Sequence, residues 1–202
     1  MWYNTDGGGV LEAAINGSQA PDIRLYEERD YRFVQKICIE ADRYFPKEKV
    51  DELLILYCNY YIEQEPENCL VLSDEDSVAV GYLMLSPDWD NYVEAYRREY
   101  MPRLRRVSRF QYYQKKRELA GDSDLHAAYP AHLHIDISSN YRGKGLGTAM
   151  TDAGIQHLRS LGCPGVMLGV GPDNAGAVRF YERYGFECLI KRSNELLYGL
   201  KL

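Results

Sequence analysis

The chain has 202 residues, of which 46% are hydrophobic and 27% charged, and its formal net charge at pH 7 is −6. This balance is typical of a globular protein with one domain, so it excludes a wholly disordered chain and disfavours a general polyanion binder. No apolar run reaches the length of about 18 residues that a membrane-spanning helix needs. Five cysteines, widely spaced and without a CxxC pair, favour a reducing, cytoplasmic location over a disulfide framework or a metal site.

The first twenty residues contain three consecutive glycines and few large apolar side chains. Such a segment cannot bury enough surface to offset the entropy that it would lose on ordering. We therefore expect a flexible tail over residues 1–20 and a folded domain over residues 21–202.

The next residues predict the first layer of the fold. Residues 23–26 alternate like a strand, residues 34–41 have helical spacing, and Pro46 is expected at the first turn of a second helix. The apolar stripe of this second helix is expected to be Val50, Leu53, Leu54, Tyr57 and Tyr61. Two apolar runs at residues 69–72 and 78–85, separated by an acidic turn, predict a β-hairpin.

Residues 88–125 interrupt this pattern because they are rich in Tyr, Arg and Lys and are predicted to be helical up to Ala120. We interpret them as an insertion between two strands. Within them, residues 97–117 carry nine basic side chains and one acidic one, a charge of +8, which leaves −14 for the rest of the chain. A solvated helical face is the first interpretation of this basic segment. A contact for a phosphate or an acidic acceptor is the second, and nucleic acid is the third.

Beyond the insertion, strands and helices alternate. The predicted elements are a strand over 131–137, a helix over 146–161, a strand over 166–170, a helix over 174–184 and strands near 186–190 and 195–200. Alternation of this kind predicts a layered α/β or α+β domain.

A glycine-rich loop with the sequence YRGKGLGT, residues 141–148, lies between the strand 131–137 and the helix that follows. Its three glycines allow the backbone to approach a ligand closely, and its amides lie at a helix N-terminus, where unsatisfied donors and the helix dipole favour phosphate. The spacing fits neither GxxxxGK[ST] nor GxGxxG. A flexible turn is the alternative interpretation of the loop taken alone.

Two motifs in order resemble those of the GCN5-related N-acetyltransferase (GNAT) family. Residues 142–147, RGKGLG, fit the pyrophosphate-loop pattern [QR]xxGx[GA], and residues 174–186, NAGAVRFYERYGF, fit the second motif, NxxAxxFYxxxGF. The resemblance implies an α/β (α+β) fold with a central, mixed, mostly antiparallel twisted sheet of about seven strands. In this fold strands 4 and 5 splay apart and helices lie on both faces, and here a helical insertion precedes strand 4.

A finer resemblance involves the strand HLHIDI at residues 132–137, the tripeptide GYL at residues 81–83 and the aromatic and basic insertion. Together they look like the acetyltransferase-like domains related to the C-terminal part of the O-GlcNAc hydrolases. Some members of that group are suspected to be inactive. The alternative to a transferase is therefore an acetyl-CoA-binding pseudo-acetyltransferase that acts as a regulatory or interaction module.

The family resemblance implies acetyl-CoA as the acyl donor, a primary amine on a small molecule or protein as the acceptor, and no metal. The backbone near Ile135 and Ile137 would pair with the pantetheine arm, and Asn174 would bond the pantetheine chain. Asn174 could equally be a plain helix N-cap. The residues implied to hold the pyrophosphate are Arg142, Gly143, Lys144, Gly145, Leu146, Gly147 and Thr148. The sequence does not identify the amine and leaves a homodimer open.

Two catalytic roles follow from the same resemblance. Tyr181 occupies the place of the family tyrosine that donates a proton to the sulfur of CoA. The base is sought on the strand 131–137, where alternation places His132, His134 and Asp136 on one face. Their arrangement resembles the His-Leu-His strand of serotonin N-acetyltransferase, although its register to the glycine loop differs by one residue and a bulge would exchange the faces. His134 is favoured over Asp136 because of its ordinary pKa, and a structural His–Asp network is the alternative.

Overall fold

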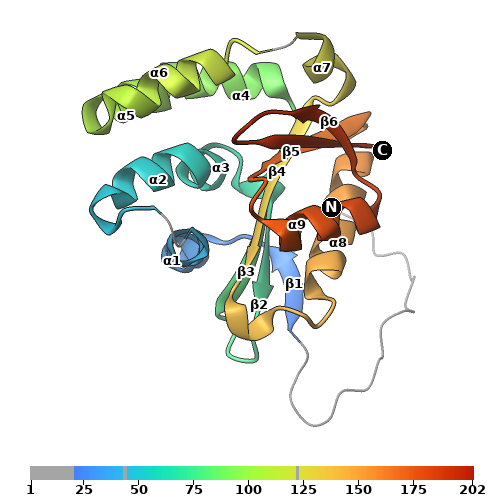
Figure 1. Ribbon diagram of the computed structural model, residues 1–202. Helices are drawn as coiled ribbons and strands as arrows, with labels where there is room; N and C mark the ends of the chain where they lie inside the picture. Colours follow the sequence, from blue (N-terminus) through green and yellow to red (C-terminus); the bar gives the residue numbers. More distant parts are fainter. Residues whose placement is uncertain (1–20, 43–44, 122) are drawn as a thin grey trace, which may run out of the picture.

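The structure is a computed structural model that describes residues 21–42, 45–121 and 123–202. The tail expected over residues 1–20 lies outside the described residues. The described chain contains a seven-stranded sheet with the strand order β1-β2-β3-β4-β5-β7-β6 (Figure 1). The strands are β1 (Asp22–Leu25), β2 (Cys69–Ser73), β3 (Ala79–Ser86), β4 (Ala131–Ile137), β5 (Gly165–Val170), β6 (Glu187–Lys191) and β7 (Leu196–Lys201).

Neighbouring strands are antiparallel everywhere except at β4 and β5, which are parallel. The expected mixed, mostly antiparallel sheet is therefore confirmed, as is the hairpin of β2 and β3. The parallel contact is short, since only Ala131 and His132 of β4 pair with β5. Beyond His132 the two strands separate, which is the expected splay.

Helices cover both faces of this sheet, with α1 to α3 on one side and α8 and α9 on the other (Figure 1). The helices are α1 (Tyr31–Ala41), α2 (Val50–Tyr57), α3 (Asn59–Gln64), α4 (Trp89–Ala95), the π-helix η4 (Tyr96–Tyr100), α5 (Met101–Val107), α6 (Arg109–Glu118), α7 (Ser123–Ala128), α8 (Leu146–Ser160) and α9 (Ala175–Tyr184). Short 3-10 turns are η1 (Glu28–Asp30), η2 (Lys47–Lys49), η3 (Pro66–Asn68) and η5 (Ser139–Tyr141). Within the described part of the chain, none of these helices has the length and apolarity needed to cross a bilayer.

Strand β3 is buried on both faces because its side chains alternate between two apolar cores. Tyr82 and Met84 enter the core beneath α1 to α6, and Leu83 and Leu85 enter the core beneath α8 and α9. Full burial of an apolar side chain of this size contributes about 2 kcal/mol. The strand is thus held from both sides, and it fixes the position of β4, which pairs with it from His132 to Ile137.

Helices α4 to α7 occupy the segment that the sequence marks as an insertion. Helices α4, η4 and α5 run outward from the sheet, and α6 returns beside α5 as the second arm of a helical hairpin (Figure 1). The first arm has a buried residue at every fourth position, namely Tyr92, Tyr96, Tyr100 and Leu104. This stripe packs in the same core as α2 and α3. The hairpin is therefore anchored by aromatic packing over the helical layer.

Lys115 alone is buried among the basic side chains of residues 97–117, all of which the structure describes. Its Nζ lies 2.6 Å from a Glu118 carboxylate oxygen and 4.9 Å from the centre of the Tyr96 ring. Burial acts to lower the pKa of Lys115, but the charge of Glu118 and then the Tyr96 phenol act more strongly together, so that the pKa is raised above its ordinary value. The ammonium is therefore charged inside the core and depends on one carboxylate.

This dependence predicts unequal effects of two substitutions on stability. Glu118→Gln is expected to lower the free energy of unfolding by about 2 kcal/mol, because it leaves a buried ammonium without its counter-ion, although water replaces part of the loss at a half-exposed carboxylate. Lys115→Met is expected to change it by less than about 1 kcal/mol, because it removes charge and desolvation together. Urea unfolding of both variants measures the difference. A larger loss for Lys115→Met would contradict this account.

The second predicted helix was wrong in two respects. Pro46 precedes the 3-10 turn η2 instead of opening α2, and the helix breaks at Cys58, where φ is −131° and ψ is −59°. The buried stripe assumed one continuous helix. Because of the break, Tyr57 lies at the end of α2 with 43% of its surface exposed, and its ring faces His134.

Candidate functional site

The glycine loop has a backbone that L-residues rarely adopt. Gly143 has φ of +77° and Gly145 has φ of +79°, and a Cβ added at either would meet no other atom within 4 Å. Gly145 caps α8 without a side-chain hydrogen bond, and the helical ladder begins with the Ala149 N–H bonded to the Gly145 carbonyl. The amides of the first turn have no intrahelical acceptor. Open space around the two glycines and unsatisfied amides at a helix N-terminus suit the loop to contact with an anion.

Two cationic side chains border this loop. Arg142 Nε donates a hydrogen bond to the Ile137 carbonyl at 2.5 Å, and its Nη2 lies 4.0 Å from Asp136 Oδ1. Lys144 is exposed and extends over the Tyr141 ring. The arginine thus ties the loop to the end of β4, and both charges favour a phosphate beside the amides.

The edge of β4 beside the loop has no partner strand on one side. Residues 133–137 pair with β3 but not with β5, since the pairing with β5 ends at His132. Ile135 and Ile137, the residues expected to hold an extended ligand chain, lie in this stretch. The splay therefore leaves room for a chain to lie along β4, and their role stays a prediction.

Helix α9 brings the second motif against the first. A Cβ at Gly147 would lie 3.7 Å from the Phe180 ring, so α9 packs directly on the first turn of α8. At the start of α9, Asn174 Oδ1 accepts a hydrogen bond from the Ala177 N–H at 3.1 Å. The N-cap role of Asn174 is thus observed, and its role toward a ligand stays a prediction.

Tyr181 lies on the inner face of α9 and is 8% exposed. Its ring packs against Phe186 and Tyr198, and its hydroxyl makes no hydrogen bond to any described residue. Burial, and to a lesser degree the Asp136 carboxylate, raises the pKa of the phenol above its ordinary value. Tyr181 is therefore a protonated donor whose hydroxyl has no partner among the described residues.

The β3–β4 pairing is regular, so the faces of β4 are those predicted and no bulge exchanges them. Asp136 lies directly opposite Tyr82, whose hydroxyl donates to Asp136 Oδ2 at 2.9 Å. Burial raises the pKa of Asp136 to about 6, although the Tyr82 hydrogen bond and the Arg142 charge act in the opposite direction. A carboxylate with this pKa changes protonation close to neutral pH, as proton-transfer groups do.

His134 lies in an aromatic setting. Its ring makes edge contacts with Tyr57 and Tyr61 at centroid distances of 5.9 and 5.3 Å. Burial, and then the charge of Lys115, lowers the pKa of His134 to about 4. The imidazole is therefore neutral at pH 7 and weakly basic.

His132 is enclosed more deeply than the other two polar residues of the strand. It is 8% exposed, its ring lies 4.4 Å from that of Tyr92, and neither of its nitrogens has a partner among the described residues. Burial lowers its pKa well below the ordinary value. His132 is thus a neutral group of the core, distant from the open end of β4.

The structure brings together the glycine loop, the free edge of β4 and Asp136, and it places Tyr181 in the core beneath α8 and α9. Three contributors to this arrangement were missed by sequence reasoning: Tyr82, Tyr57 and Lys115. Tyr82 had a usable signal, because a lone tyrosine in an apolar strand needs a hydroxyl partner. Tyr57 and Lys115 had no such signal. The position of Tyr57 depends on the helix break at Cys58, and that of Lys115 depends on which side of α6 packs into the core.

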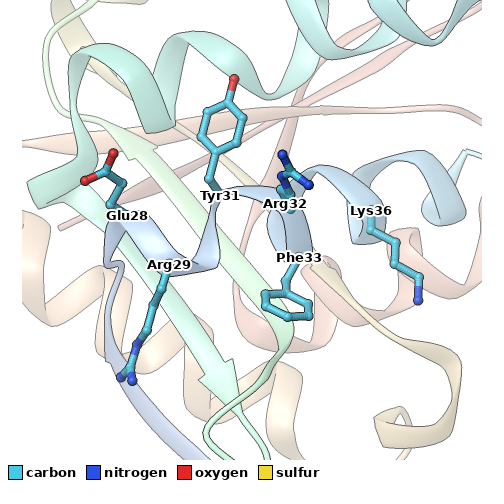
Figure 2. Close-up of a pocket in the computed structure, with 6 residues that line it drawn as sticks. All are labelled: Glu28, Arg29, Tyr31, Arg32, Phe33 and Lys36. Atoms are coloured by element: carbon cyan, nitrogen blue, oxygen red, sulfur yellow. The ribbon is translucent and has the colours of Figure 1, made fainter.

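A shallow depression of about 660 Å³ lies elsewhere, on η1 and the first turns of α1. Figure 2 shows that its lining side chains spread apart, with Tyr31 and Phe33 on opposite sides of the helix. It lacks converging groups and is separate from the site on β4. Among the residues described by the structure, no cluster of His, Cys, Asp or Glu is arranged to hold a metal ion.

Comparisons with known proteins match the same elements. The sequence model described as the acetyltransferase (GNAT) family matches residues 34–186. A mycothiol acetyltransferase of Parafrankia sp. is 50% identical over 52 residues, 26% of this chain and 16% of that protein. An uncharacterized N-acetyltransferase of Methanocaldococcus jannaschii is 38% identical over 66 residues, 32% of this chain and 29% of that protein. The chain thus matches less than a third of the length of these relatives.

Two solved structures share the fold over nearly the whole chain. SsHAT superposes with a TM-score of 0.81 at 26% identity, covering 91% of this chain and 98% of that one. A chain of the NatC complex bound to Gag peptide and CoA superposes with a TM-score of 0.59 at 16% identity, covering 91% of this chain and 99% of that one. The second likeness is one of fold alone.

Proposed function

The chain belongs to the acetyltransferase (GNAT) family, and on that premise we propose that it is an N-acetyltransferase that moves the acetyl group of acetyl-CoA to a primary amine. One observation carries the proposal. The edge of β4 from Leu133 to Ile137 is free of β5 and is tied to the glycine loop through Arg142, with Asp136 on this stretch and the buried phenol of Tyr181 in the core beneath α8 and α9. A protonated acid and a group that titrates near neutrality are the pair that amide formation from a thioester requires.

The residues present fit acetyl-CoA. The open, positive-φ glycines and the first-turn amides suit its pyrophosphate, Arg142 and Lys144 add positive charge, and the free edge of β4 suits its pantetheine arm. When bound, acetyl-CoA supplies an activated acyl group. A backbone amide near Ile135 would stabilise negative charge on the acyl oxygen.

Proton transfer is assigned to two side chains. The attacking amine loses a proton to Asp136, whose Oδ1 has no described partner closer than Arg142 at 4.0 Å, and the new C–N bond replaces the C–S bond. The Tyr181 hydroxyl donates its proton to the departing thiolate. His134 is the second choice of base because a pKa of about 4 makes it a weak acceptor. Asp136 is therefore preferred to His134 as the base, whereas the ordinary pKa of histidine suggests the opposite.

A second candidate function is an acetyl-CoA-binding pseudo-acetyltransferase. The observation that favours it is the engagement of Asp136 by Tyr82 and Arg142, which is also what a structural network would give. The finer resemblance to the O-GlcNAc hydrolase-related domains, carried by the β4 strand and the insertion, belongs to this alternative. The short match to mycothiol acetyltransferase covers 26% of the chain and does not identify the acceptor.

An assay of thiol release tests the proposal. The protein is incubated with acetyl-CoA and, separately, with polyamines, amino sugars, free amino acids and lysine-containing peptides. We expect at least one amine to raise thiol release above the amine-free rate and to gain an acetyl group by mass spectrometry. Stabilisation by acetyl-CoA without turnover of any amine would favour the pseudo-enzyme, and absence of stabilisation would contradict both functions.

A further inference from the structure

The α5–α6 hairpin carries exposed positive charge that the described chain does not neutralise. No carboxylate of a described residue lies within 4 Å of five of its cations: Arg105, Arg106, Arg109, Lys116 and Arg117. Arg105 lies over the Tyr112 ring at 5.8 Å and makes no ion pair among described residues. By contrast, Arg98 pairs with Glu99, Arg103 with Glu63 and Lys115 with Glu118. These three cations are thus compensated by carboxylates, and the five listed before them are not.

Exposed apolar side chains accompany these cations on the same hairpin. Val107, Phe110 and Tyr113 are 45%, 70% and 57% exposed, and they make up three of the seven large hydrophobic side chains exposed in the described chain. On α6, Arg109, Phe110, Tyr113, Lys116 and Arg117 share an arc of about 120° at 3.6 residues per turn. The buried Lys115 and Leu119 lie on the opposite side of the same helix. We call these five cations and three apolar residues the hairpin face.

We propose that the hairpin face binds an acidic protein segment that carries apolar side chains. It combines aromatic side chains with arginine, two residue types that are enriched in protein interfaces relative to the rest of the surface. Four of its five cations are arginines, which pair with carboxylates in a bidentate manner and stack on rings. The face lies at the other end of the molecule from the glycine loop (Figure 1), so it is independent of the proposed acetyl-CoA site.

Two other occupants fit less well. A symmetric dimer through this face would place like charges against each other, which opposes association. A long nucleic acid would extend from the +8 segment over a remainder that carries −14, which repels a polyanion. A short acidic segment avoids both kinds of repulsion. It is opposite in charge to the hairpin face, and it need not extend beyond α6, which is about 15 Å long at 1.5 Å per residue.

Calorimetric titration of the full chain with synthetic probes tests the proposal. The acidic probe is a peptide of roughly ten residues in which Asp and Glu alternate with Phe and Leu. A matched peptide replaces the acids with Asn and Gln, and oligothymidylate is the third probe. We expect the acidic peptide to bind at low salt at least about ten-fold more tightly than either of the others, and to weaken as salt rises.

Paired variants locate the binding. Arg109→Gln with Lys116→Gln, and separately Phe110→Ser with Tyr113→Ser, are each expected to lower the affinity for the acidic peptide by about ten-fold. The control is Arg32→Gln with Phe33→Ser, an exposed arginine and aromatic pair on α1 (Figure 2), which is expected to leave it unchanged. All these side chains are solvent-accessible, and circular dichroism verifies folding. No binding of the acidic peptide, equal binding of the neutral peptide, tighter binding of oligothymidylate, or an equal loss in the control overturns the proposal.

Discussion

Gly145→Glu is expected to abolish the stabilisation of the protein by acetyl-CoA. Gly145 has φ of +79° and immediately precedes α8, so a glutamate there strains the backbone and places a carboxylate in front of the amides proposed to bind the pyrophosphate. The wild-type chain should gain roughly 2.7 kcal/mol of stability when acetyl-CoA exceeds its Kd about 100-fold. The variant should gain none. Thermal unfolding with and without acetyl-CoA measures both values.

Gly162 supplies a matched control. It lies just beyond the other end of α8 with φ of +76°, and a Cβ there also meets nothing within 4 Å. Gly162→Glu therefore introduces the same residue, similar strain and the same charge away from the glycine loop, and it should keep the full response to acetyl-CoA. If the two variants respond alike, the loop does not bind the pyrophosphate.

The glycine loop and the mixed, mostly antiparallel sheet were predictable because their signals are local or recurrent. The positive φ at position 145 favours glycine. The alternation of side chains between the two faces of β4 follows from strand geometry. The family motifs then added the splay between β4 and β5, which no single residue encodes. Local signals and the family resemblance thus predicted the backbone around the site, but neither predicted the side-chain contacts within it.

Contacts between distant segments were the part that could not be predicted. Tyr82 and Asp136 are 54 positions apart, and their hydrogen bond depends on the β3–β4 register. Lys115 belongs to a basic segment whose other cations face water, and only packing shows that this one enters the aromatic core. Its charge helps to lower the pKa of His134, which reverses the preferred order of the two candidate bases. A residue's ordinary pKa is therefore a weak guide where burial and one remote charge decide it.

Asp136→Asn is expected to lower kcat/KM by about 10²- to 10⁴-fold without weakening the response to acetyl-CoA, because it removes the proposed base and keeps the side chain's shape. In the wild type, kcat/KM should rise with pH through an apparent pKa of about 6, as Asp136 becomes ionised. The Tyr82 hydrogen bond lowers this pKa, so Tyr82→Phe should move the rising limb to higher pH. Measurement of kcat/KM against pH for the three proteins, with the best amine of the panel, separates a base from a structural carboxylate. His134→Gln is the comparison, and a larger loss there would return the base to the histidine.

The same substitution should separate stability from activity. Because the folded-state pKa of Asp136 is raised from 3.8 to about 6, the stability linked to its proton is complete below about pH 4 and is lost as pH rises through 6. An asparagine carries no such dependence. Asp136→Asn should therefore gain in Tm relative to the wild type as pH increases from 5 to 8, even as turnover is lost. A variant that loses both activity and stability over this range would mark Asp136 as a support of the sheet rather than a group that moves a proton.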